Sequence, residues 1–260
     1  MLSASARFLG RLSGQFLIRI GLFWMRWRAT RFEIEISGLG QVQRFGDSVY
    51  LIVSNHVGPE VSAFGRLARV RIARQFNHSL DSFIFHRVVW EQTGRRLGVV
   101  AICDRGRWSH RPLVRFLQRR IGQPFAKAQL EAIGYIPVEA NPGCFQRDFL
   151  RSARRAVEHG RPLLIFPAGD NSSQFESGAS LKPGAAHLAL HFGVPIVPAC
   201  IQGTASWNPP GKAIVRFGEP FTPDGLTKRE VSDRIAWEIA RLLGETSPGS
   251  EHAPAALPAR

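Results

Sequence analysis

The chain has 260 residues, with 34 Lys and Arg against 20 Asp and Glu, which gives a formal net charge of +14 at pH 7. The 44% hydrophobic content is typical of a globular protein with a sizeable core, and three scattered cysteines form neither a disulfide framework nor a metal-ligand spacing. Such a charge favours anionic lipid, nucleic acid or acidic substrates as partners. No segment resembles a base-reading helix or an aromatic RNA-binding strand, so we expect no nucleic-acid partner.

Residues 1–30 form a basic amphipathic segment, and the first carboxylate of the chain is Glu33. Apolar side chains recur at steps of three and four, the spacing of one helical face, while Arg19 breaks the run that a spanning helix would need. No secretory signal fits. We therefore expect a helix in the interface of an anionic membrane, peripheral or monotopic, at the cytoplasmic face of the inner cell membrane. The alternative is a helix packed on the protein's own core.

Residues 31–243 alternate strand-like and helix-like segments. The expected strands lie within 31–40, 48–55, 96–103, 132–139, 161–169, 194–203 and 212–221. The expected helices are 82–93, 111–122 (ending at Gly122), 144–160, 183–193 and 227–243. This alternation predicts a single α/β domain with a mostly parallel central sheet covered by helices. Residues 244–260, rich in Pro, Ala and Ser, are expected to be a disordered tail.

Four sequence blocks carry a family resemblance. The most specific is LKPGAAHLALHFGVPIVPACIQGT at 181–204, a Lys-x-Gly turn, a small-residue helix and a Val-Pro-Ile-Val-Pro strand. RPLLIFPAGDNSS, AIGYIPVEANPG and RFEIEISGLGQVQRFGDSVYLIVSNH precede it in the chain. In this order they resemble the glycerolipid acyltransferase family of the lysophosphatidate acyltransferase type, over roughly residues 30–220. The resemblance implies acyl transfer from acyl-CoA or acyl carrier protein to a lysophospholipid or related acceptor, without further cofactor or metal.

The family's catalytic signature is Asn-His with an aspartate five residues after the histidine, and neither Asn-His pair here has that spacing. His78 lies three residues before Asp81, so the two side chains can share one helix face. His56 ends a predicted strand and meets Asp81 only if the segment between them is an insertion. In a third interpretation one histidine is a loop or helix-cap residue without catalytic role. Asp81, which would orient the base, belongs to both catalytic interpretations, and His78 is the favoured base.

The resemblance also implies an acceptor-binding loop and phosphate contacts, with departures from the family. Ala140 and Asn171 stand where the family has arginines that hold the acceptor's phosphate, and Ala168 replaces its glutamate. The acceptor-binding residues carried over are Phe166, Pro167, Gly169, Asp170, Asn171 and Ser172. Other cations could contact phosphates of acceptor or donor, namely Arg105, Arg111, Arg115 and Lys182. The departures leave two alternatives open: N-acylation of an amino-lipid precursor of the ornithine-lipid type, or a catalytically inactive lipid-binding relative.

Overall fold

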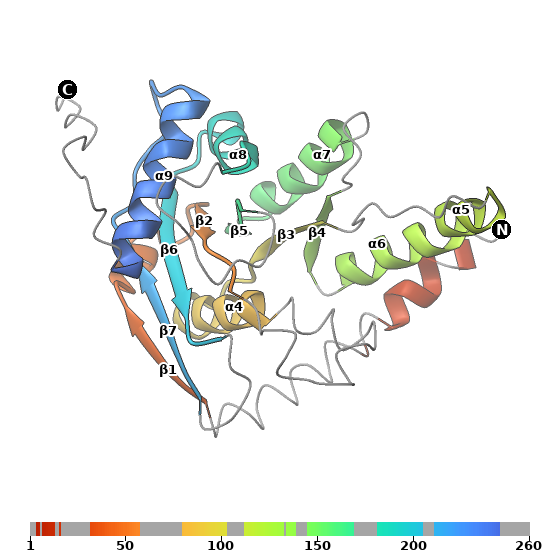
Figure 1. The fold of residues 1–260 in the computed structure, drawn as a ribbon, viewed down its shortest axis with the longest axis horizontal. Coiled ribbons are helices and arrows are strands. Elements are labelled where there is room, and N and C mark those ends of the chain that lie inside the picture. Colours follow the sequence, from red (N-terminus) through yellow and green to blue (C-terminus); the bar gives the residue numbers. More distant parts are fainter. Residues whose placement is uncertain are drawn as a thin grey trace.

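The computed structural model describes residues 4–5, 7–13, 16, 32–57, 80–102, 112–132, 134–138, 145–168, 181–204 and 211–244. These residues form one seven-stranded sheet in the order β1-β7-β6-β2-β5-β3-β4 (Figure 1). Its strands are β1 Phe32–Ser37, β2 Leu51–Ser54, β3 Gly98–Ile102, β4 Tyr135–Val138, β5 Leu163–Ile165, β6 Ile196–Gln202 and β7 Gly211–Phe217. All neighbouring strands pair in parallel except β6 and β7, which are antiparallel. The predicted fold class is confirmed.

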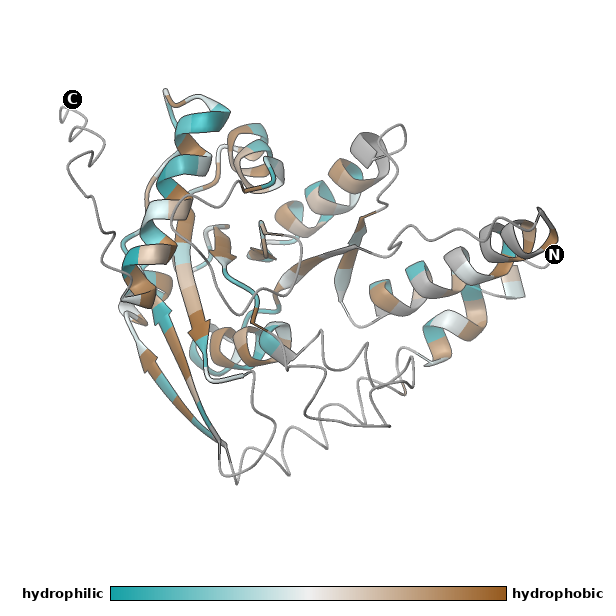
Figure 2. Cartoon of the chain, viewed as in Figure 1, coloured by the Kyte–Doolittle hydropathy of each residue, from teal (hydrophilic) through white to brown (hydrophobic). Residues whose placement is uncertain are grey.

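The strand sequences match their places in the sheet. β2 lies in the middle, between β6 and β5, and all four of its residues are buried, as expected for a parallel strand covered on both faces. β1 lies at the edge and alternates exposed glutamates with half-buried isoleucines, so teal and brown alternate along it in Figure 2. The centre of the sheet is therefore covered on both faces, and a side chain at the end of β2 begins from a buried strand that is paired on both sides.

Helices cover both faces of the sheet. The helices are α2 Gly40–Gln43, α4 Leu80–Thr93, α5 Pro112–Leu117, the π-helix η2 Gln118–Gly122, α6 Gln123–Ala132, α7 Phe145–Glu158, α8 Gly184–Phe192 and α9 Lys228–Leu243. One apolar cluster joins α4, through residues such as Phe85 and Val88, to the sheet. A second cluster joins α7, α8 and α9 to the other face, through residues such as Ala153, Leu188 and Ile235. The site described below lies on the α4 side.

The helix expected to end at Gly122 does not end there. α5 passes through the π turn η2 into α6, which ends at Ala132. Pro124 follows the π turn by two residues and has no backbone N–H to donate to an α-helical hydrogen bond. A wider turn accommodates the missing donor without ending the helix, so the glycine is no stop signal at this position.

The N-terminal segment is described only in part. Residues 7–13 are helical, and Gly10 is buried against α6, where an added Cβ would lie 2.4 Å from the Phe125 carbonyl oxygen. Among the described residues, no helix is both long and apolar enough to cross a bilayer. Residues 17–31 and 245–260 lie outside the described residues, so the interfacial helix over 1–30 and the disordered tail stay predictions.

Candidate active site

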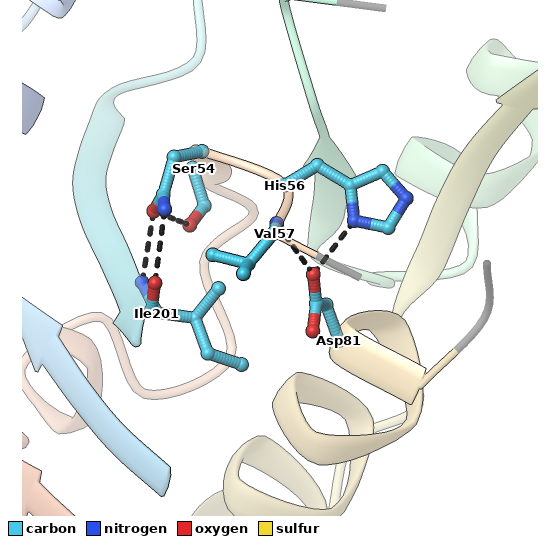
Figure 3. A network of polar contacts seen from close by, with 6 residues as sticks. Ser54, His56, Val57, Asp81 and Ile201 are labelled. Carbon is cyan, nitrogen blue, oxygen red and sulfur yellow. Dashed lines mark hydrogen bonds and ion pairs between the residues drawn. The ribbon is translucent and has the colours of Figure 1, made fainter. Parts of the chain in front are cut away.

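Asn55 fixes the direction in which the chain leaves β2. Backbone pairing between β2 and β6 ends at Ser54 and Ala199. Beyond it, the Asn55 side chain donates from Nδ2 to the Ile201 carbonyl at 2.9 Å and accepts the Ile201 N–H on Oδ1 at 2.9 Å. Both bonds end at Ile201 in Figure 3. The amide thus continues the sheet where the backbone cannot, and both of its bonds are buried. The next residue, His56, is held at the carboxyl end of the central strand.

His56 lies on a buried carboxylate. Its Nδ1 is 2.7 Å from Oδ2 of Asp81, a residue 25 positions later in the first turn of α4 (Figure 3). The backbone N–H of Val57 donates to the same oxygen at 2.9 Å. The Asp81 side chain is fully buried and the His56 side chain is 10% exposed. Two donors and the positive end of the α4 dipole compensate the desolvation of the carboxylate.

The hydrogen bonds assign the tautomer of the His56 ring. An ionised carboxylate can only accept, so Nδ1 carries the proton that bonds to Asp81. The lone pair is then on Nε2, which points away from Asp81 in Figure 3. An imidazole oriented by a buried carboxylate, with its second nitrogen unprotonated, is the arrangement of a general base.

Phe166 covers the ring of His56. It follows β5, and its ring stacks on the imidazole with centroids 4.5 Å apart and planes at 23°. Behind it, Phe85 of α4 contacts Phe166 at 6.4 Å between centroids, and Phe217 of β7 contacts Phe85 edge-on at 6.0 Å. The imidazole is therefore held by Asp81 at its edge and by an aromatic group, supported by the core, on its face.

The structure tests the choice between the two histidines only in part. It brings His56 and Asp81 together, as the insertion interpretation predicts. His78, the favoured base, lies outside the described residues, so its role stays a prediction. The pairing of His56 could not be read from local spacing, because it joins the end of a strand to a helix 25 residues later.

The other predicted site residues are placed as follows. Phe166 is half-buried against the α4 core cluster, and Pro167 is buried. Lys182 is exposed, and its backbone N–H donates to the Pro167 carbonyl at 3.1 Å, which joins the two family blocks. Arg115 lies in α5, but its side chain is not described. Outside the described residues lie Gly169, Asp170, Asn171, Ser172, Arg105 and Arg111.

Asn55 was missing from the predicted site. Its place before a histidine at the end of a buried strand was visible in the sequence, but its partner Ile201 is 146 residues away. In the part of the chain that the structure describes, no group of three or more His, Cys, Asp or Glu side chains could hold a metal ion.

Comparison with known proteins identifies the central part of the chain. Residues 76–202 match the family model described as Acyltransferase. Over 95 residues, 34% of this chain and 34% of the relative, the chain is 30% identical to an uncharacterised acyltransferase of Schizosaccharomyces pombe. Over 91 residues it is 30% identical to the chloroplastic 1-acyl-sn-glycerol-3-phosphate acyltransferase BAT2 of Brassica napus, covering 35% of this chain and 26% of the relative. The chain thus spans about a third or less of the length of these curated relatives.

A solved structure also resembles the chain. The 1-acyl-sn-glycerophosphate acyltransferase PlsC of Thermotoga maritima is 16% identical, with a TM-score of 0.47 over 95% of this chain and 81% of that one.

The family match begins at residue 76, so it contains Asp81 and His78 but not His56. The pairing of His56 with Asp81 is therefore an observation of the structure alone.

Proposed function

Since this chain belongs to the acyltransferase family, we propose that it transfers a fatty acyl group from a thioester donor, acyl-CoA or acyl carrier protein, to a lysophospholipid or related lipid acceptor. The observation that carries the proposal is the buried His56–Asp81 pair with Nε2 of the imidazole turned away from the carboxylate. The family match supplies the reaction class, and the pair supplies the group that such a reaction needs.

The residues present account for each proton and bond of the reaction. The acceptor hydroxyl donates to Nε2 of His56, which takes the proton as the oxygen attacks the thioester carbonyl carbon. The C–S bond of the tetrahedral adduct then breaks, and the thiolate leaves with the proton held on Nε2. Asp81 keeps the ring in the required tautomer and stabilises the imidazolium between the two steps. The products are an ester and a free thiol, with neither a covalent enzyme intermediate nor a cofactor.

The loop after β5 bears on the identity of the acceptor. The relative from Brassica napus is named for 1-acyl-sn-glycerol-3-phosphate, but the loop after β5 carries Ala168 and Asn171 where the family resemblance expects glutamate and arginine. Position 171 therefore has no guanidinium to bind the acceptor's phosphate. This favours, as a second candidate, an amine acceptor of the ornithine-lipid type, because an amine needs the same base but no phosphate site. A lipid acceptor places either reaction at a membrane, and we propose the cytoplasmic face of the inner membrane.

The test is turnover with a panel of acceptors. The purified full chain is incubated with acyl-CoA or acyl carrier protein and with lysophospholipids or amino-lipid precursors, and free thiol release and acylated product are measured together. We expect product with at least one acceptor, and a loss of about 10²–10⁴-fold in His56→Ala. His191→Ala, which removes an exposed histidine of α8, is the matched control and should retain activity. His78→Ala decides between the bases: a larger loss there than at His56 would restore His78 as the base.

A further inference from the structure

Exposed large hydrophobic side chains gather on one helical arm. Within the described residues, all of them except Trp90 and Trp237 lie in residues 8–16 or on α5 and η2. On α5 and η2 they are Leu113, Phe116, Leu117 and Ile121, with exposures from 38% to 70%. Isolated exposed hydrophobic residues are ordinary, but a cluster of this kind marks a binding surface.

The two segments belong to the same arm, which we define as the described residues 7–13 and 16 together with 112–132. Gly10 is pressed against the Phe125 carbonyl and Ala128 of α6, so the N-terminal helix packs on the helix that continues α5 and η2. Figure 1 shows this arm projecting beyond the end of the sheet, and Figure 2 shows hydrophobic residues on both of its segments. The exposed apolar residues of the N-terminal helix and of α5 and η2 therefore belong to one packed helical unit.

The charges of the arm favour an anionic partner. Residues 112–132 contain four cations, Arg115, Arg119, Arg120 and Lys127, and one carboxylate, Glu131, at the end of α6; residues 1–32 contain no carboxylate. The Arg120 guanidinium lies over the exposed Phe116 ring, 5.7 Å from its centroid. Apolar groups interleaved with cations fit the interface of an anionic bilayer. There the lipid acyl chains surround the aromatic rings, and the lipid phosphates bind the guanidinium groups. A second copy would bring two faces of net positive charge together, which disfavours self-association.

We propose that α5 and η2, together with Phe8, Leu9, Leu12 and Phe16, form one surface that inserts into the interface of an anionic membrane. This inference rests on the proposed function, since an enzyme that acylates a lipid takes its acceptor from a bilayer. The surface is separate from the catalytic pair, so binding can be measured without turnover.

The experiment compares two double variants that each place two glutamates at exposed hydrophobic positions. The full chain is titrated with vesicles of phosphatidylcholine alone or with one third phosphatidylglycerol, and bound protein is measured by co-sedimentation. We expect binding that depends on phosphatidylglycerol and weakens with salt. Leu113→Glu/Phe116→Glu should lower the affinity by about tenfold or more for each side chain that can no longer insert. Trp90→Glu/Trp237→Glu, two exposed aromatic residues off the arm, should change it less than about twofold.

Failure of this proposal differs from failure of the proposed function. If both double variants bind vesicles like the unmodified chain, the arm is not the membrane surface. If the arm variant instead turns a dimer into a monomer by light scattering and binds vesicles unchanged, the face pairs with a second copy and the proposal is wrong. The arm variant should still turn over a short-chain, water-soluble donor and acceptor. If the unmodified chain shows no turnover with any substrate, the proposed function is wrong, while the proposed membrane surface is unaffected.

A separate observation concerns the stack of Phe166 on His56. Family resemblance suggests acceptor binding for Phe166, whereas its ring lies on the imidazole at 4.5 Å and is backed by Phe85. We infer that Phe166 is a positioning residue that acts through His56. It prevents rotation of the ring out of line with Asp81, and its negative face stabilises the imidazolium formed when the acceptor hydroxyl gives up its proton. This inference rests on the proposed function.

Kinetics and ring-proton shifts test this role independently. In Phe166→Leu we expect kcat to fall about tenfold with an unchanged KM for the acceptor, and Phe166→Tyr should restore kcat because it keeps the ring. By NMR, the His56 ring protons should show an upfield ring-current displacement that Phe166→Leu abolishes and Phe166→Tyr retains. A raised KM with unchanged kcat would return Phe166 to acceptor binding. Absence of the ring-current displacement in the unmodified chain would refute the stack itself, whatever the activity.

Discussion

Side chains tie the backbone at both ends of the central strands, but with different chemistry. At the amino ends, arginines do so. Arg95 donates to carbonyls of the turn before β2, at Gly46, Asp47 and Ser48, and to Gly160 ahead of β5. Arg161 donates to the carbonyls of Leu97 and Gly134, ahead of β3 and β4. At the carboxyl ends, the neutral and buried Asn55 joins β2 to β6, and the His56–Asp81 pair follows.

The difference separates stability from chemistry. A guanidinium has donors only and is always charged, so at the partly exposed amino edge it can hold several carbonyls but cannot take up a proton. At the carboxyl edge, the amide satisfies both a donor and an acceptor of Ile201, and the imidazole uses one nitrogen for Asp81 while the other keeps a lone pair. Substitutions at the two edges should therefore affect different measurements.

The largest effect is expected for Asp81→Asn. The amide has nearly the shape of the carboxylate but can hold the imidazole in the wrong tautomer, with the proton on Nε2. We expect kcat to fall by about 10³–10⁴-fold. The free energy of unfolding should change little, because a buried charge is removed together with its desolvation cost. Steady-state kinetics and urea unfolding measure the two quantities, and a variant with full kcat would remove Asp81 from the mechanism.

Asn55→Ala should affect both measurements. It leaves the N–H and the carbonyl of Ile201 buried without their partner, at a cost of about 2–4 kcal/mol in unfolding free energy. It also releases the turn that carries His56, so kcat should fall even in the folded fraction. Gln43→Ala, which removes one amide of the exposed Gln43–Gln92 pair, is the control and should change neither quantity. Loss of stability with unchanged kcat would show that the turn keeps its shape without this side chain.

Arg95→Ala should affect stability alone. Its bonds to the turn before β2 are charge-assisted but partly exposed, so we expect a loss of about 1–2 kcal/mol in unfolding free energy. The kcat should stay within about twofold, because the amino ends lie away from the site. The neighbouring and exposed Arg96, changed to Ala, is the matched control. A fall in kcat at Arg95 comparable to that at Asn55 would contradict the separation of the two edges.

The amino-acid sequence predicts the sheet better than the site, for a physical reason. Apolar runs such as those of β2, β5 and β6, bounded by Gly and Pro, report burial through their own composition, so the α/β class could be predicted. The site depends on contacts between distant segments. Local spacing favours His78 as the partner of Asp81, whereas the His56 contact requires Asn55 to reach a strand 146 residues later. The helix end at Gly122 was wrong because the effect of Pro124 is to widen the turn, not to end the helix.

The smallest expected effect is the pH dependence that His86 gives to the amino edge. His86 lies on α4, and partial burial, with the charges of Arg161 and Arg96, lowers its pKa in the folded protein. The unfolded chain takes up this proton near pH 6.5, and the folded protein only at lower pH. The contribution of neutral His86 to the unfolding free energy is therefore complete above about pH 6.5, and it is lost as the pH falls below that value.

His86→Gln should make this decrease less steep between pH 7 and pH 5 in urea unfolding, while His159→Gln, at an exposed position, should leave it unchanged. A remaining slope of the same sign is expected from His187, whose pKa is lowered by burial and by the charges of Lys228 and His191. An unchanged slope in His86→Gln would show that the amino edge does not sense pH.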